Sequence, residues 1–213
     1  MTRQLPHTAP PQSARSDARD NRARILDAAR AVFGEVGLSA PMREVARHAG
    51  VGPATLYRHF PAKQDLIAEA FAEQRRDCRA IVRDALAEAD PWRGFRSLVE
   101  RICELHAYSR GFADAFMVSF PETMDFAADR ERTLRAVAEL ARRAQETGRL
   151  RPGFVVDDLV LMLMAHRGVQ DTPRDTRLAA SRRFAAYVIE AFRALPESEP
   201  PTPLPPAPRL PLG

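Results

Sequence analysis

The chain has few cysteines and no long apolar run. Its 213 residues include only two cysteines, too few for the dense disulfide framework of a small secreted scaffold. Cys78 and Cys103 are therefore expected to be reduced, partly buried thiols, with a redox switch as the alternative. The absence of about 18 consecutive uncharged apolar residues excludes a membrane span. Residues 1–21 carry arginines and prolines without an apolar centre, so we expect no secretion signal and a cytoplasmic protein.

Signatures of the common enzyme classes are missing as well. The five histidines, at positions 7, 48, 59, 106 and 166, show no HExxH or metal-cluster spacing. The two cysteines form no zinc pair, and no serine lies in a G-x-S-x-G motif. The run Gly50-Val51-Gly52 lacks the third glycine and the preceding strand of a dinucleotide site. We predict that the protein is not an enzyme and needs no metal or other cofactor.

Strand-like alternation of β-branched residues is also absent, whereas Ala, Arg, Leu and Glu are abundant. This composition predicts an all-α protein, and the length suits a small N-terminal module followed by a larger domain. We expect a disordered arm over 1–18 and a helix-turn-helix domain over 19–65. A helical domain over 66–195 and a proline-rich disordered tail over 196–213 complete the chain.

Three short helices are predicted near the N-terminus. Apolar residues at helical spacing indicate the first over 22–36. The second, over 41–51, is opened by a proline and stopped by a glycine. The third lies within 51–63, is very short and is pinned by Leu56 and Phe60. Two short helices joined at a glycine are typical of a helix-turn-helix.

Polar side chains of the third helix are suited to DNA. Thr55, Tyr57 and His59 offer hydroxyls and a ring nitrogen to phosphate oxygens. The planar fork of Arg58 can grip a guanine edge or a phosphate in two places. Lys63 lies near the start of the next helix, whose N–H groups would face the same anion. The alternative is a solvated polar turn between two helices.

The basic excess of the chain lies at the same end. The formal net charge is +4, and residues 1–65 hold ten Lys/Arg against six Asp/Glu. The remainder holds 22 of each sign. A modest excess of this size is compatible with nucleic-acid binding but is weak evidence alone.

These segments resemble the DNA-binding domain of the TetR family of bacterial transcriptional regulators over residues 19–71. The resemblance is carried by AARAVFGEVG at 28–37, VARHAGV at 45–51 and ATLYRHFPAKQDL at 54–66. It implies two groups of contacts. Phosphates would be held by Thr55, Tyr57, His59 and Lys63, and base edges would lie near Arg43, Pro53, Ala54 and Arg58. Gly52 is a further candidate for DNA contact, without an assigned role. Relatives often place a serine at the position of Gly52 and hydroxyls at Pro41-Met42, so Arg43, Tyr57 and Arg58 would carry more of the readout.

The second domain is predicted to hold a ligand. A long helix over 62–88 would connect it to the first domain, and a helix over 92–109 would follow. Aromatic residues and methionines there make an adaptable apolar cavity or, as the alternative, plain core. The resemblance implies an inducer cavity, and no charged anchor is evident, so we expect a mostly apolar or aromatic effector. The candidates are Trp92, Phe95, Ile102, His106, Phe112, Phe116, Met117, Phe120, Met124, Met162 and His166.

The last two predicted helices suggest a dimer. The run 159–166 is apolar nearly all round, and the final helix, over 174–194, alternates small with large apolar residues. Two such helices from each subunit would make a four-helix interface, the alternative being a monomer core. The expected interface residues are Leu159, Leu161, Leu163, Phe184, Tyr187, Val188 and Ala191.

Together these features predict a ligand-responsive transcriptional regulator. We expect a homodimer that binds double-stranded DNA at a palindromic operator, acts as a repressor and is released by a small molecule. The alternative is a DNA-compacting or ligand-binding protein without operator specificity.

Overall fold

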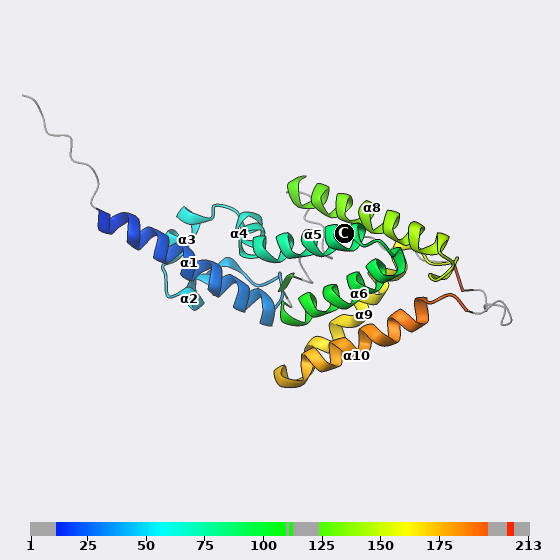
Figure 1. Ribbon diagram of the computed structural model, residues 1–213. Coiled ribbons are helices and arrows are strands. Elements are labelled where there is room, and N and C mark those ends of the chain that lie inside the picture. Colours follow the sequence, from blue (N-terminus) through cyan, green and yellow to red (C-terminus); the bar gives the residue numbers. More distant parts are fainter. Residues whose placement is uncertain (1–11, 110, 113–123, 196–203, 207–213) are drawn as a thin grey trace, which may run out of the picture.

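A computed structural model of the chain describes residues 12–109, 111–112, 124–195 and 204–206 (Figure 1). This part of the chain is all-α, as predicted, and contains nine α-helices and one 3-10 turn. The helices of the first half are α1 (Gln12–Glu35), α2 (Met42–Ala49), α3 (Pro53–His59), α4 (Lys63–Ala70) and α5 (Ala72–Ala87). Those of the second half are α6 (Pro91–Tyr108), α8 (Met124–Glu146), α9 (Val156–His166), η1 (Arg167–Asp171) and α10 (Arg174–Phe192).

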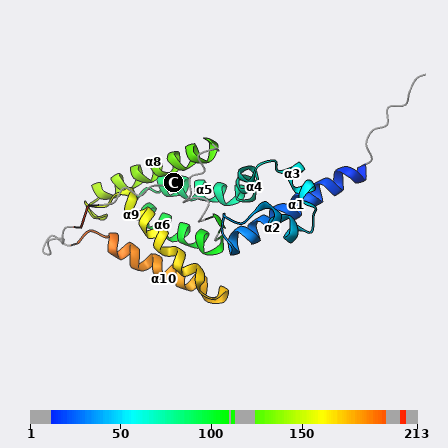
Figure 2. The ribbon, with the colours of Figure 1, turned by 180° about the vertical axis from the view of Figure 1, so that it is seen from behind.

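The helices form an elongated molecule with two parts. Helices α1–α4 gather at one end, and we call them the head (Figure 1). The remaining helices, α5–α10, form the body, in which α5 and α6 lie between α8 on one side and α9 and α10 on the other (Figure 2). The buried apolar residues make one cluster that runs from Ile25 in α1 to Ile189 in α10. Head and body therefore share a continuous core.

Helix α1 begins earlier than predicted. Its first residue is Gln12, inside the range 1–18 that was expected to be a disordered arm, so that expectation is wrong for residues 12–18. The physical reason lies in the composition. Residues 12–40 contain no proline and are rich in alanine and arginine, which favour a helix. Residues 1–11 lie outside the described part of the chain.

The predicted long helix over 62–88 is interrupted at Phe71. This residue has φ −107° and ψ 17°, and α4 ends before it while α5 begins after it. Two arginine side chains take carbonyls that a continuous helix would use for its own N–H groups. Arg30 Nη1 donates to the Ala70 carbonyl at 3.2 Å, and Arg75 Nη2 donates to the Ala68 carbonyl at 3.0 Å. The connection between head and body is thus not one continuous helix but two helices with a break at Phe71, which we call the joint.

Helices α5 and α6 approach each other closely at Gly94. A Cβ atom at this position would lie 2.3 Å from the carbonyl oxygen of Ala85, so only glycine fits. The start of α6 is fixed by Asp90, whose carboxylate accepts hydrogen bonds from the backbone N–H of Trp92 at 3.0 Å and of Arg93 at 3.3 Å. Proline at position 91 completes this helix start, as the sequence predicts.

The C-terminal end of the described body is held to the α8–α9 connection. Leu150 and Arg193 form an isolated antiparallel bridge, and the backbone N–H of Ala194 donates to the Arg149 carbonyl at 2.9 Å. Most of the predicted tail over 196–213 lies outside the described residues. Among the described helices none has the length and apolar composition needed to span a bilayer.

Candidate nucleic-acid interface

Helices α2 and α3 meet at a tight turn around Gly50. This glycine has φ 64°, the left-handed conformation that ends many helices, and its N–H bonds back into α2. A Cβ here would lie 2.8 Å from Arg24 Nη2 of α1, so the close approach of that guanidinium also favours glycine. Three residues further on, Pro53 opens α3 at its first position with Gly52 as the extended N-cap. The turn sets α3 at an angle to α2, as in a helix-turn-helix.

Two buried residues hold α3 in place. Leu56 has no exposed surface and Phe60 is 1% exposed, so one side of this seven-residue helix is sealed into the head. Tyr57 on the opposite side is 51% exposed. Most of the other predicted DNA-contacting residues are also exposed or half-buried at the surface: Arg43, Gly52, Pro53, Ala54, Thr55 and Arg58. The arrangement of inward anchors and outward polar groups is the one that the sequence predicts.

Two arginines of α1 position the motif, and the sequence patterns indicated neither of them. Arg24 Nη2 donates to the Ala49 carbonyl at 2.6 Å, which satisfies the end of α2. Arg22 Nη1 donates to the His59 carbonyl at 3.2 Å, and its guanidinium lies 4.4 Å from the centre of the Phe60 ring. Arg22 also forms an ion pair with Glu69 of α4. The apolar helix spacing of α1 gave no signal for this role, because the partners lie 25 to 47 residues away.

Lys63 is the first residue of α4, where helix N–H groups are exposed to an anion. It is half-buried, with its ammonium 5.9 Å from the centre of the Phe33 ring. Partial burial lowers the pKa of Lys63 below its ordinary value. A phosphate at this position would stabilise the charged ammonium and offset that loss of hydration. The phosphate contact of Lys63 stays a prediction.

His59 fits its predicted role less well. The residue is half-buried, and its Nε2 atom is enclosed without a hydrogen-bond partner among the described residues. A phosphate contact from this ring would therefore have to use Nδ1. The enclosure of Nε2 arises in the folded chain and has no signal in the local sequence.

The predicted ligand-binding residues do not form one site. Trp92 and Phe95 lie at the first turn of α6, whereas His106 lies at its last turn, roughly 20 Å away at the helical rise. Phe95 contacts Phe154 edge-on with ring centres 5.1 Å apart, and Phe154 contacts Phe192 at 4.9 Å. Phe95 is thus a core residue. Phe116, Met117 and Phe120 lie outside the described residues, and so does the side chain of Met124.

A second group of candidates does come together in the interior of the body. The rings of His106 and His166 lie 6.4 Å apart, and His106 packs edge-on against Phe112 at 5.9 Å. Burial lowers the pKa of His106 to about 3 and also lowers the pKa of His166. His166 Nε2 lies 2.8 Å from the hydroxyl of Ser181, which donates to the Cys103 carbonyl at 3.0 Å. Both imidazoles are neutral at physiological pH.

The buried pair connects three helices of the body, α6, α9 and α10. Met162 joins the same region, with its sulfur 3.8 Å from Cys103 Sγ, and Ile102 is buried beside it in the sequence. Cys78 and Cys103 are both buried, more fully than the sequence predicts, and burial raises the pKa of their thiols to about 12.

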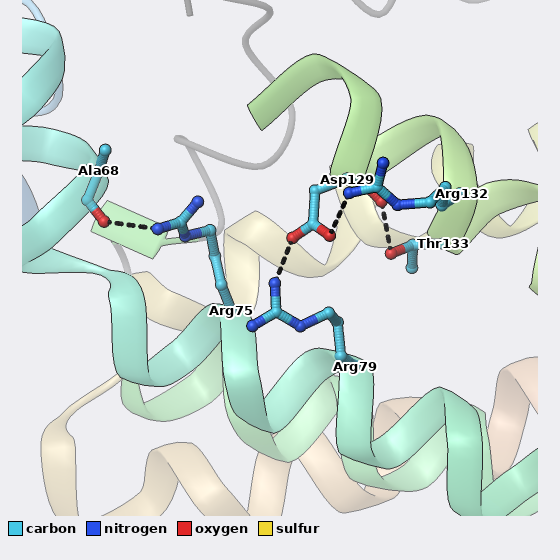
Figure 3. Close-up of polar contacts among 6 residues, drawn as sticks. All are labelled: Ala68, Arg75, Arg79, Asp129, Arg132 and Thr133. Atoms are coloured by element: carbon cyan, nitrogen blue, oxygen red, sulfur yellow. Dashed lines mark hydrogen bonds and ion pairs between the residues drawn. The ribbon is translucent and has the colours of Figure 1, made fainter. Parts of the chain in front are cut away.

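A groove between α5 and α8 contains charged groups that no sequence pattern indicated. It has a volume of about 280 Å³ and carries Arg79 and Arg132 on its two walls, with Asp129 between them (Figure 3). The body therefore holds a cluster of charged side chains, whereas no charged anchor was evident from the sequence. Arg79 and Asp129 are 50 positions apart in the sequence and meet only in the folded chain.

The predicted dimer residues fall into two classes. Leu159 and Leu163 are 4% exposed because they pack inside their own subunit, so they cannot be interface contacts on the surface of this fold. Leu161 is 49% exposed and Tyr187 is 61% exposed. Ala191 is exposed, and Phe184 and Val188 are half-buried. Met164, which was not predicted, is exposed beside Leu161 on α9 and extends the apolar surface.

Comparisons with known proteins agree with this geometry. Residues 25–70 match the model of the bacterial regulatory proteins of the tetR family, and residues 90–189 match the SbtR-like transcriptional regulator C-terminal domain. HTH-type transcriptional regulators of Staphylococcus aureus, including that of strain USA300, are 45% identical over 53 residues. That match covers 24% of this chain and only 29% of the relative, so it concerns a part of each chain.

Solved structures extend the likeness over both parts. A TetR transcriptional regulator of Streptomyces coelicolor is 29% identical, with a TM-score of 0.50, and the match covers 81% of this chain and 98% of that one. The ketosteroid transcriptional regulator KstR2 of Mycobacterium tuberculosis is 21% identical, with a TM-score of 0.63, over 82% and 95% of the two chains. A tetR-family protein of Rhodococcus RHA1 is 21% identical, with a TM-score of 0.64, over 81% and 94%.

The fold and the head therefore define a helix-turn-helix regulator of transcription with a helical second domain. The two matched domain models lie in the same order as head and body and together span more than two thirds of the chain. The chain belongs to the TetR family of transcriptional regulators, whose members bind DNA.

Proposed function

We propose that this protein is a ligand-responsive repressor that binds a palindromic operator as a homodimer. The observation that carries the proposal is the arrangement of α3. Leu56 and Phe60 seal one side of the helix into the head, while Tyr57 and Arg58 are exposed. Lys63 begins the following helix, α4. One short helix reads few base pairs, so specificity requires two copies about one helical turn of DNA apart.

The roles within this surface differ by chemistry. Arg58 is suited to a base edge because its planar guanidinium can donate two parallel hydrogen bonds to guanine. Lys63 is suited to phosphate because it is a point charge at a helix start. Arg22 and Arg24 have a supporting role instead, because they hold the ends of α3 and α2 through hydrogen bonds to backbone carbonyls. A dimer on an operator would block polymerase, which makes repression the expected outcome.

Selection of bound fragments from random DNA tests operator recognition. We expect one palindrome to be enriched and to compete sharply against bulk DNA. In binding assays on that palindrome, Arg58→Ala should reduce discrimination between operator and random DNA. Lys63→Ala should weaken binding to both DNAs alike and lower the salt slope by about one unit. Uniform binding to all sequences would instead support a DNA-compacting protein.

The dimer is supported by the exposed apolar residues of α9 and α10. Leu161, Met164 and Tyr187 present a surface that water does not favour, and α9 and α10 lie side by side at the edge of the body (Figures 1 and 2). Sedimentation should show a dimer for the unmodified chain and monomers for Leu161→Glu. Val36→Glu, which changes an exposed apolar residue of the head, is the matched control and should remain dimeric. A monomeric unmodified chain would contradict the proposal.

Ligand response is supported by the interior of the body. The apolar surroundings of His106 and His166 and the groove between α5 and α8 both lie beside helices that reach toward the head. A molecule that binds better to one arrangement of these helices shifts the population of that arrangement, and DNA affinity changes by the same factor in return. The effector is expected to have a substantial apolar part.

A further inference from the structure

The groove between α5 and α8 has a basic rim. Arg79 Nη1 donates to Asp129 Oδ2 at 2.7 Å, and Arg132 Nη2 donates to Asp129 Oδ1 at 3.2 Å (Figure 3). Two guanidinium groups therefore share a single carboxylate. Arg83, the third arginine of the lining, pairs instead with Asp84, which does not line the groove. The rim thus has an excess of positive charge.

The other side of the groove is apolar. Val82 is buried on α5, and Leu86 and Ala136 are half-buried on α5 and α8. These residues continue the line of the rim along both helices, since Val82 and Leu86 follow Arg79 at helical spacings of three and seven residues. The groove therefore offers exposed cations along its rim and less exposed apolar side chains between them. The full lining is Arg79, Val82, Arg83, Leu86, Asp129, Arg132, Thr133 and Ala136.

We propose that this groove binds an amphiphilic anion, a carboxylate or phosphate ester that carries an alkyl chain. The anionic group replaces the Asp129 carboxylate between Arg79 and Arg132, and the chain lies over Val82, Leu86 and Ala136. Arginine matches this ligand because its planar fork binds carboxylate and phosphate in two places. The volume of about 280 Å³ suits a chain of roughly ten carbons together with its head group.

Asp129 acts as an internal competitor for the ligand. Its side chain is only 14% exposed, whereas those of Arg79 and Arg132 are 48% and 62% exposed. The carboxylate is thus held inside the groove while the guanidinium groups reach outward, and each guanidinium has five N–H donors. An incoming anion can use donors of both arginines, and the Asp129 side chain then has to turn out of the groove to be hydrated.

The contacts around the groove connect it to the joint between head and body. Arg75 lies one helical turn before Arg79 on α5, and its Nη2 donates to the Ala68 carbonyl of α4 across the break at Phe71 (Figure 3). Exchange of Asp129 for a ligand loosens α8 from α5, the helix that begins at this joint. The assignment of the anion as effector rests on the regulatory function proposed above. The binding of the anion to the groove does not depend on that function.

Calorimetry on the full chain tests the ligand class. The probes are decanoate and decyl phosphate, with decanol and decyltrimethylammonium as neutral and cationic counterparts. We expect the two anions to bind at least tenfold more tightly than decanol and the cation to bind weakest. Each CH₂ added between octanoate and decanoate should strengthen binding about fourfold, if it is buried. Equal binding of decanol and decanoate would overturn the proposal.

Variants test the location. Arg79→Gln and Arg132→Gln should each weaken decanoate binding about tenfold or more. Arg142→Gln should leave it unchanged, because this exposed arginine of α8 pairs with Glu139 and Glu146 outside the groove. Asp129→Asn should strengthen binding, because it removes the competing charge, whereas a purely structural Asp129 would give weaker binding or none. Melting curves of every variant identify losses caused by unfolding. Unchanged affinity in both arginine variants of a folded protein would place the anion elsewhere and overturn the proposal.

Operator-binding assays distinguish a failure of the ligand site from a failure of the proposed DNA-binding function. On the selected operator, decanoate should lower the affinity of the unmodified chain and have a smaller effect on Arg79→Gln. Anion binding in the groove with unchanged operator affinity would overturn the assignment as effector site while leaving the DNA-binding function intact. Failure to select any operator would contradict the proposed function, and the calorimetry would still decide whether the groove binds anions.

Discussion

The head carries its candidate functional polar residues on its surface, whereas the body carries polar residues in its interior. In the head, the polar residues of α3 lie outside while Leu56 and Phe60 lie inside. In the body, the interior itself is polar in part, since all three buried polar residues of the described chain, His106, His166 and Ser181, are found there. One short segment of sequence can supply the polar groups of a surface site. Polar groups in an interior need hydrogen-bond partners that are distant in sequence, as Ser181 and Cys103 are.

The largest effect is expected where the body is most tightly packed. Gly94→Ala should lower the free energy of unfolding by about 3 kcal/mol, because the new Cβ would lie 2.3 Å from the Ala85 carbonyl oxygen and the backbone must move. Chemical denaturation measures the change. Gly153→Ala, where no atom lies within 4 Å of the added Cβ, is the control and should change stability little. Equal stability of both variants would show that α5 and α6 are loosely packed.

The buried imidazoles should make the body sensitive to acid. The folded state keeps His106 neutral, with its pKa lowered from 6.5 to about 3, whereas the unfolded chain takes up the proton as the pH falls below 6.5. Stability is thus fully present above pH 6.5 and is lost on acidification, by about 2 kcal/mol at pH 5 from this residue.

Denaturation at a series of pH values measures this loss. His106→Gln should reduce the slope between pH 6.5 and 5, and the remainder should come from His166, whose pKa burial also lowers. His48→Gln, which changes an exposed histidine of the head, should leave the slope unchanged. An unaltered slope in His106→Gln would show that the body interior is wetter than its packing indicates.

Loss of one arginine should affect the head more modestly. Arg22→Ala removes the hydrogen bond to the His59 carbonyl, the ion pair with Glu69 and the contact with the Phe60 ring. We expect about 1.5 kcal/mol lower stability and weaker binding to all DNA sequences, since α3 loses its anchor but no base contact. Arg47→Ala, at an exposed arginine of α2, is the stability control. A loss of sequence discrimination alone would instead place Arg22 at the DNA.

The smallest effect should be a gain. Gly34 lies near the end of α1, and a Cβ added there would have no atom within 4 Å, so alanine fits without displacement. Gly34→Ala should raise stability by about 0.5–1 kcal/mol through helix propensity. The same substitution therefore has opposite signs at Gly34 in the head and Gly94 in the body. A destabilised Gly34→Ala, measured by thermal melting, would show that the head is as closely packed as the body.

The sequence predicted the elements of the head well because their signals are local. The proline at 41 and the glycine at 50 set the ends of α2, and the spacing of Leu56 and Phe60 set the buried side of α3. The start of α1 was misjudged because residues 12–18 follow a proline-rich stretch, although they are good helix formers themselves. The role of Arg22 depended on a carbonyl of another helix, so no local pattern could indicate it.

The body was predicted less completely. Its helices were found from apolar spacing, but the division at Phe71 was missed, because arginine side chains from α1 and α5 take the carbonyls there. The candidate ligand residues were split, because aromatic residues at the two ends of α6 have different neighbours. Leu159 and Leu163 were assigned to an interface because an all-round apolar helix shows that it is covered but not by what.

The interruption at Phe71 determines what kind of motion can pass between the two parts. A continuous helix transmits rotation about its own axis to the domain at its end. Where the chain leaves the helical conformation for one residue, as at Phe71, a translation or a tilt is transmitted but little rotation about the helix axis. Any signal that travels along α5 should therefore displace or tilt the head rather than turn it about the axis of α5.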